Sequence, residues 1–222
     1  PMHPTALFDL DGTLVDSAPD LHAAADRMAA RLGLAPYRLD EIIGMIGDGV
    51  HVLIERALAA RGRPFDQDAY ERFLEDYAAH AAVATRPFSG IPEALDALAA
   101  AGWRMAVCTN KHEHAARVLL DALGLLGRFA AIGGGDTFPV RKPDPEHLLA
   151  TLRAAGGDPA QAVMIGDHRN DIGAASGAGI PCVFAAWGYG PAEMAQGAAA
   201  IAGTPAALPA LLQRLVAARA TP

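Results

Sequence analysis

Two aspartates separated by one residue directly follow a short apolar run near the start of the chain. The run is Thr5-Ala6-Leu7-Phe8, and Asp9, Asp11 and Gly12 come after it. Side chains at i and i+2 lean to the same side of an extended chain, so these carboxylates repel unless a cation lies between them. Hard divalent cations prefer carboxylate oxygens, and Gly12 allows a sharp turn behind the pair. The pattern predicts either a ligand site at the end of a buried strand, where open α/β sheets bind ligands, or a plain polar turn.

Two further polar clusters follow apolar runs in the same way. Thr109 and Asn110 come between the run 105–108 and a helical pattern. Free N–H groups at a helix start bind phosphate, and a Thr hydroxyl adds a donor, although Asn110 also fits a helix-capping box. Asp167 follows the run 163–165 and is expected to complete a metal site. Asp171 either binds that metal through water or caps the next helix.

Lys142 is the residue that could neutralise an anion at such a site. It lies between Arg141 and Pro143, in a polar segment before a helical pattern that begins near Asp144. An ammonium group is a compact charge that suits both a phosphate and a carboxylate nucleophile. By itself, the segment also fits a solvated basic turn before that helix.

Short apolar runs alternate with helical patterns through most of the chain. The runs cover 6–8, 105–108, 130–132, 162–165 and 182–185, and the helical patterns cover 92–101, 112–123, 145–155 and 171–178. This alternation predicts an α/β fold with a doubly wound parallel sheet that helices cover on both faces.

One long segment between the first two strands reads as helical throughout. It contains helical patterns at 21–32, 49–60 and 68–82. We expect a discontinuous α/β core formed by residues 1–16 and 85–222, with an inserted helical domain at 17–84. The segments 16–18 and 84–88 would be its two hinge strands.

The overall composition favours a soluble cytoplasmic protein. A net charge of −7, without blocks of like charge, gives no electrostatic footprint for nucleic acid. The two cysteines lie in apolar runs typical of buried thiols, and we expect neither a signal peptide nor a membrane-spanning segment.

Four ordered stretches resemble the motifs of the haloacid dehalogenase-like superfamily, which consists largely of phosphatases. The stretches are Phe8-Asp9-Leu10-Asp11-Gly12-Thr13, Val107-Cys108-Thr109-Asn110-Lys111, Arg141-Lys142-Pro143-Asp144-Pro145 and Gly166-Asp167-His168-Arg169-Asn170-Asp171. The resemblance implies that Asp9 is a phosphate-accepting nucleophile and Asp11 a general acid and base. It further implies that Thr109, Asn110 and Lys142 bind phosphate, and that Asp9, Asp167 and the main-chain carbonyl of Asp11 bind Mg²⁺. Because the catalytic lysine of the family has the same Lys-Pro context, the resemblance favours Lys142 over Arg141, which we expect at the surface.

Within the superfamily, the chain looks most like the members that hydrolyse 2-phosphoglycolate, a small phosphorylated metabolite. The resemblance also implies a helical cap over the site, in which the loop around Asp48 and His51 would select the leaving group. A phosphatase of another small metabolite, a sugar-phosphate mutase and a non-catalytic phosphate-binding protein remain alternatives.

Overall fold

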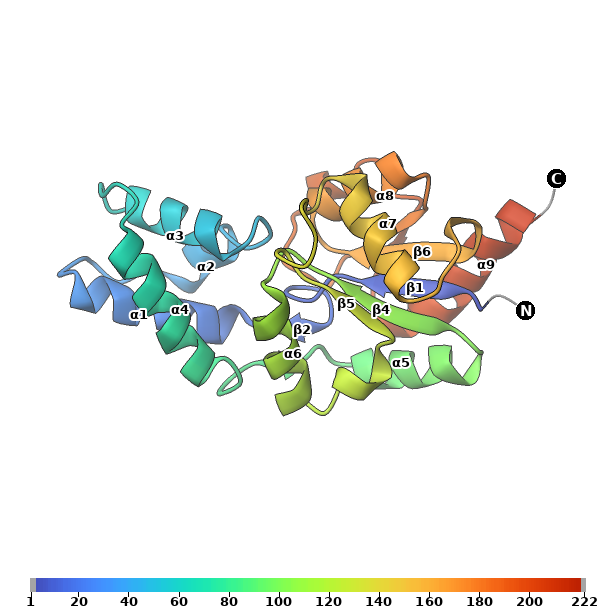
Figure 1. The fold of residues 1–222 in the computed structure, drawn as a ribbon, viewed down its shortest axis with the longest axis horizontal. Coiled ribbons are helices and arrows are strands. Elements are labelled where there is room, and N and C mark those ends of the chain that lie inside the picture. Colours follow the sequence, from blue (N-terminus) through green and yellow to red (C-terminus); the bar gives the residue numbers. More distant parts are fainter. Residues whose placement is uncertain (1–2, 221–222) are drawn as a thin grey trace.

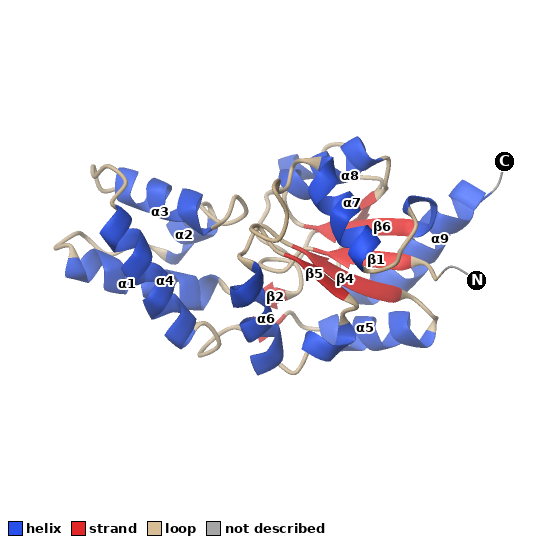
Figure 2. Cartoon of the chain, in the orientation of Figure 1, coloured by secondary structure: helices blue, strands red, loops and turns tan. Residues whose placement is uncertain are grey.

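Six parallel strands form the central sheet of the computed structural model, which describes residues 3–220 (Figures 1 and 2). The ends of the predicted core, residues 1–2 and 221–222, lie outside the described residues. The strand order is β5-β4-β1-β6-β7-β8, so the chain builds the sheet outwards from β1 in both directions. The predicted doubly wound α/β fold is therefore confirmed. The strands are β1 (Thr5–Phe8), β4 (Arg104–Cys108), β5 (Ala131–Gly133), β6 (Ala162–Gly166), β7 (Cys182–Ala185) and β8 (Ala200–Ala202).

Helices cover both faces of this sheet, which explains why its strands are almost wholly apolar. Leu7 packs in the hydrophobic cluster of α7 (Pro145–Ala154) and α8 (Arg169–Ala178). Its neighbours Ala6 and Phe8 pack in the opposite cluster, with α5 (Ile91–Ala100), α6 (Glu113–Ala122) and α9 (Leu208–Ala220).

Four helices are inserted between the first two strands of the sheet. They are α1 (Ala18–Arg31), α2 (Leu39–Ile43), α3 (Val50–Ala59) and α4 (Gln67–His80), and we call them the helical unit. Met28, Ile54 and Phe73 belong to a hydrophobic cluster of the unit's own. Figure 1 shows the unit beside the sheet, next to the edge at which α6 begins.

Two short strands connect the helical unit to the sheet. β2 (Val15–Asp16) and β3 (Arg86–Pro87) pair antiparallel; β3 lies within the predicted hinge segment 84–88, whereas β2 begins one residue before the predicted segment 16–18 and shares only Asp16 with it. Beside them, the buried carboxylate of Asp20 accepts hydrogen bonds from the N–H groups of Ala84 and Thr85 and from the Thr85 hydroxyl. One side chain of α1 thus fixes the returning linker.

Several elements were absent from the sequence prediction. Helix α2 has only five residues, and β8 and α9 lie in an alanine-rich region with little contrast between polar and apolar positions. The 3₁₀ helices η1 (Leu126–Arg128), η2 (Pro159–Gln161), η3 (Ala192–Ala195) and η4 (Pro205–Ala207) were also not predicted. None of the helices within residues 3–220 has the length and apolar character needed to cross a membrane.

Candidate active site

The carboxyl ends of three adjacent strands meet at one edge of the sheet, and a polar residue follows each. Asp9 follows β1, Thr109 follows β4 and Asp167 follows β6, and all three are buried. The N–H of Asp9 still donates to the Ile165 carbonyl at 2.9 Å, so the ladder of β1 and β6 continues into the site. The sheet itself therefore positions these three side chains.

Three carboxylates converge at this edge. Asp9, Asp167 and Asp171 each offer an oxygen, and these atoms lie within 4.8 Å of one another. Burial, and next the charge of Asp171, raises the pKa of Asp9 to about 7, although Lys142 opposes the shift. Burial, and next the charge of Asp9, raises the pKa of Asp167 to about 7. Buried oxygens crowded in this way match the donor set that hard divalent cations prefer.

Lys142 lies against two of these carboxylates. Its Nζ is 3.0 Å from Asp9 Oδ1 and 2.6 Å from Asp171 Oδ1. Its backbone is also held, because its N–H donates to Nδ1 of His147 at 3.0 Å and its carbonyl accepts from Nδ2 of Asn110 at 3.0 Å. Burial lowers the pKa of His147 to about 4, so the ring is neutral near pH 7 and can accept this hydrogen bond. Arg141 is exposed, as expected.

The contacts of Asp171 are compatible with both roles considered for it, capping of the next helix and metal binding through water. Its Oδ2 accepts from the His168 N–H at 3.0 Å in a capping box at the start of α8, while its Oδ1 accepts from Lys142. The same carboxylate is also one of the three that converge.

The carboxylate of Asp11 does not join this group. It accepts from Ser17 Oγ at 2.6 Å and pairs with Lys111 Nζ at 3.1 Å. Its main-chain carbonyl, the ligand that the family resemblance implies, is therefore the route by which Asp11 would reach a metal.

Asp167 is held from two loops. It accepts from Thr13 Oγ1 at 2.9 Å and from the Tyr189 N–H at 2.8 Å. Gly12 has a φ of 85°, and a Cβ there would lie 2.4 Å from Asp167 Oδ2. The turn after β1 can approach this carboxylate only because residue 12 is glycine.

The family model described as haloacid dehalogenase-like hydrolase matches residues 3–179. This chain belongs to that family. The resemblance drawn from the four motifs is thereby confirmed.

Named relatives of this hydrolase cover nearly its whole length. The phosphoglycolate phosphatase of Agrobacterium fabrum is 46% identical over 200 residues, which are 88% of this chain and 86% of that protein. The enzyme of the same name from Aquifex aeolicus is 41% identical over 82% of this chain and 84% of that protein.

Solved structures of similar proteins share its fold. A predicted phosphoglycolate phosphatase from Haemophilus somnus superposes with a TM-score of 0.85 at 29% identity, covering 94% of this chain and 97% of the other. CbbY from Rhodobacter sphaeroides, solved in complex with phosphate, gives a TM-score of 0.80 at 27% identity, covering 93% and 96%.

A loop of the helical unit reaches the core of the hydrolase. The Gly47 carbonyl accepts from Asn110 Nδ2 at 3.0 Å and from Asn170 Nδ2 at 3.3 Å, and Asp48 accepts from Asn170 at 2.7 Å. Asp48 also pairs with Arg56 of α3 at 2.8 Å. The ring of His51 stacks on Phe65 with centroids 4.3 Å apart.

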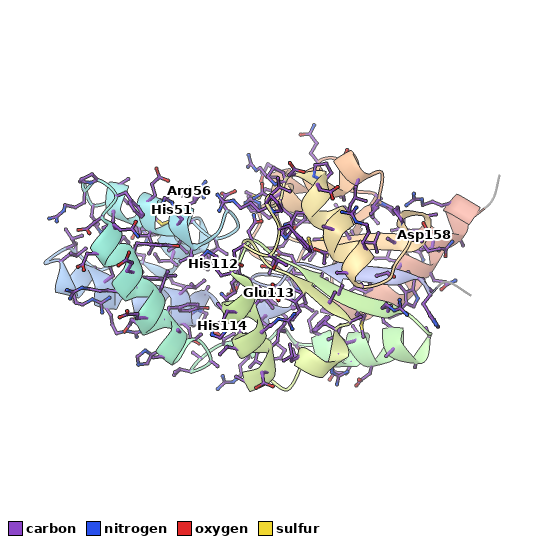
Figure 3. The ribbon with its side chains drawn as sticks, in the orientation of Figure 1. His51, Arg56, His112, Glu113, His114 and Asp158 are labelled. Carbon is purple, nitrogen blue, oxygen red and sulfur yellow. The ribbon has the colours of Figure 1, made fainter. Side chains whose placement is uncertain are left out.

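A cavity of about 70 Å³ lies between the helical unit and the core, above Asp9 and Asp11. Apolar side chains of the unit line one side, including Leu53 and Leu74, while Thr109, Asn110 and Lys111 line the other. His112 also lines it, at the start of α6, whereas Asp48 and His51 are not among its described lining residues. Figure 3 shows His51 and Arg56 within the helical unit and His112 at the end of α6 nearest to it.

The structure therefore brings Asp9, Asp11, Thr109, Asn110, Lys142 and Asp167 to one edge of the sheet, whereas Asp48 contacts the core through Asn170 and His51 packs within the helical unit. No role is predicted from the sequence for Thr13, Lys111, Asn170 or Tyr189, although the first three lie within the quoted motifs. Lys111 could have been noticed, since it directly follows the predicted phosphate-binding pair. Tyr189 reaches Asp167 from a loop distant in sequence, which no local pattern reveals.

Proposed function

We propose that this hydrolase is a magnesium-dependent phosphatase that converts 2-phosphoglycolate into glycolate and phosphate through a phospho-aspartate at Asp9. The main support is the set of curated phosphoglycolate phosphatases that are 41–46% identical over 82–88% of this chain. The convergence of Asp9, Thr109, Lys142 and Asp167 at one sheet edge supports the chemistry.

In this proposal, Asp9 attacks phosphorus and the ester bond to the leaving oxygen breaks. Asp11 donates a proton to that oxygen and later takes one from the water that attacks the phospho-aspartate. Division of the hydrolysis into two displacements lowers its activation barrier, which is very high when phosphate monoesters hydrolyse without a catalyst. Lys142 keeps the nucleophile and an incoming phosphate from repelling each other, while Thr109 and the N–H groups near Asn110 hold the phosphoryl oxygens.

The charge of the site favours a divalent cation. When Asp9, Asp167 and Asp171 are ionised, Lys142 compensates only one of the three negative charges. Asp9 and Asp167 would hold Mg²⁺ together with the main-chain carbonyl of Asp11, and Asp171 would bind the ion through water. The ion would neutralise the remaining charge and stabilise the negative charge on the phosphoryl oxygens.

We further propose that residues 17–84 form a cap domain on a core of residues 1–16 and 85–222. The separate hydrophobic cluster of the helical unit and its attachment through β2 and β3 support this division. Asp48, through its contact with Asn170, and His51 would influence selection of the leaving group indirectly, by setting how the loop lies on the core.

The experiment is a comparison of phosphorylated metabolites with the magnesium-loaded protein. We expect the highest kcat/KM for 2-phosphoglycolate, loss of turnover in a chelator and no turnover by Asp9→Asn. Undiminished hydrolysis after thorough metal removal would refute the metal site. A persistent phosphoenzyme that only a sugar phosphate discharges would instead indicate a mutase.

A further inference from the structure

Lys111 is a buried cation that the mechanism above does not use. Its side chain is 9% exposed, and it lines the cavity between the helical unit and the core. Among the described lining residues it is the only lysine or arginine. Lys142 lies deeper, against Asp9 and Asp171.

The partners of Lys111 come from both sides of the cavity. Nζ lies 3.1 and 3.3 Å from the two carboxylate oxygens of Asp11 and 3.0 Å from the Tyr77 hydroxyl of α4, and it sits 4.7 Å from the centre of the Tyr77 ring. Burial, the largest influence, lowers the pKa of Lys111, but Asp11 and Tyr77 together raise it above its usual value. The ammonium group is therefore charged and held at the cavity wall.

The remaining lining offers little else to a negatively charged leaving group. Leu21, Leu53 and Leu74 are apolar, and Asp9 and Asp11 would repel a second anion. A carboxylate that enters such a space without a counter-charge loses its hydration at a high cost in free energy. Lys111 can offset this loss of hydration by donating a charge-assisted hydrogen bond to the carboxylate.

We propose that Lys111 binds a carboxylate on the leaving group and so selects phosphate esters of small hydroxy acids. This inference rests on the proposed phosphatase function and adds the group that recognises the leaving group. The carboxylate competes with Asp11 for the same ammonium group, so binding of an acidic leaving group also loosens the Lys111–Asp11 pair.

The test compares two substrates that differ at one group. 2-Phosphoglycolate carries a carboxylate where 2-hydroxyethyl phosphate carries a neutral hydroxymethyl group. For Lys111→Met we expect the ratio of their kcat/KM values to fall about 10- to 100-fold, as for loss of a hydrogen bond between charged groups. Lys111→Arg keeps a cation and should retain most of the ratio. Arg117→Met, which removes a positive charge from α6, the helix that follows Lys111, where Arg117 pairs with Glu113, should leave the ratio unchanged.

An equal fall for both substrates in Lys111→Met would overturn the proposal, because Lys111 would then serve the phosphoryl group or Asp11. A ratio that collapses in His112→Ala but not in Lys111→Met would overturn it as well, with His112 as the recognising group.

Glycolate binding provides a readout that needs no turnover and separates this inference from the proposed substrate. Calorimetry on the magnesium-saturated protein should detect glycolate binding that Lys111→Met weakens about 10-fold or more. If the native protein fails to hydrolyse 2-phosphoglycolate but glycolate binding depends on Lys111, the proposed substrate is wrong and the carboxylate site stands. Glycolate binding that is absent in the native protein, or unchanged in a folded Lys111→Met variant, would overturn the inference.

Discussion

Replacement of Asp9 by Asn should stabilise the metal-free protein, and by more as the pH rises. The pKa of Asp9 is about 7 in the folded protein, against an ordinary value of 3.8. Since the folded-state value is raised, the folded protein keeps a proton that the unfolded chain releases. The Asp9 carboxyl therefore lowers the free energy of unfolding progressively as the pH rises from about 4 to about 7. Asn resembles the protonated acid in shape and has no proton to release.

The size of the effect follows from the width of that window. Each pH unit within it is worth about 1.4 kcal/mol for one group. Relative to a permanently neutral side chain, Asp9 lowers the free energy of unfolding by about 2 kcal/mol near pH 5 and by about 4 kcal/mol near pH 8. The advantage of Asp9→Asn should therefore grow by about 2–3 kcal/mol between these two conditions.

Urea unfolding followed by circular dichroism, with a chelator present, measures this difference between the two proteins at each pH. The buried His147, with its lowered pKa, also makes the free energy of unfolding depend on pH, but it does so in both proteins and cancels in the difference between them. Asp121→Asn, which changes an exposed carboxylate of α6, is the matched control and should show no growing gap. Addition of Mg²⁺ at about 100 times its Kd should raise the free energy of unfolding of the native protein by about 2.7 kcal/mol. The rise should be smaller for the variant, which lacks one ligand. A gap that stays constant with pH, or a variant that is less stable near pH 8, would refute the reasoning.

Three further predictions concern other parts of the site. Asp11→Asn should reduce kcat by about 10²–10⁴, because proton transfer to the leaving oxygen is lost; near-normal steady-state turnover would exclude the assigned role. Gly12→Ala should weaken Mg²⁺ binding about 10- to 100-fold in a calorimetric titration, since the added Cβ displaces Asp167; unchanged affinity would show that the turn adapts. Asp20→Ala should lower the free energy of unfolding by about 3 kcal/mol in a urea titration, because the N–H groups of Ala84 and Thr85 lose their buried acceptor. A change below about 0.5 kcal/mol would contradict this.

The sequence predicts the sheet well because its strands differ sharply from their surroundings. The run Ala6–Phe8 is wholly apolar and Asp9 follows it, so both the strand and its end are visible in the sequence. Strand β8 escapes prediction because it has three residues, two of them alanine, which is depleted in strands, and helix α9 because its polar and apolar positions differ little. Ala200–Ala202 becomes a strand through pairing with β7, which is a tertiary interaction.

Three of the proposed site residues are predictable from the sequence because each follows the end of a strand. Asp9, Thr109 and Asp167 all follow strands, so the parallel sheet is enough to bring them together. The side chains that support them come from separate turns and can be recognised only in three dimensions. Tyr189 meets Asp167 across 22 positions of sequence, and Lys111 meets Asp11 across 100.

The contacts of the helical unit with the core link its position to that of the catalytic groups. Asn110 donates through the same amide nitrogen to the carbonyl of Gly47, in the loop of the unit, and to the carbonyl of Lys142. Asn170 donates to Asp48 of the loop and lies one residue before Asp171, which contacts Lys142 Nζ. Withdrawal of the loop would thus break one of the two hydrogen bonds that the Asn110 amide donates, together with the bond between Asn170 and Asp48. The loop residues Ile46, Gly47 and Gly49 line the same cavity as Asp9, and water weakens charge interactions, so the position of the loop bears on the electrostatic environment of Asp9.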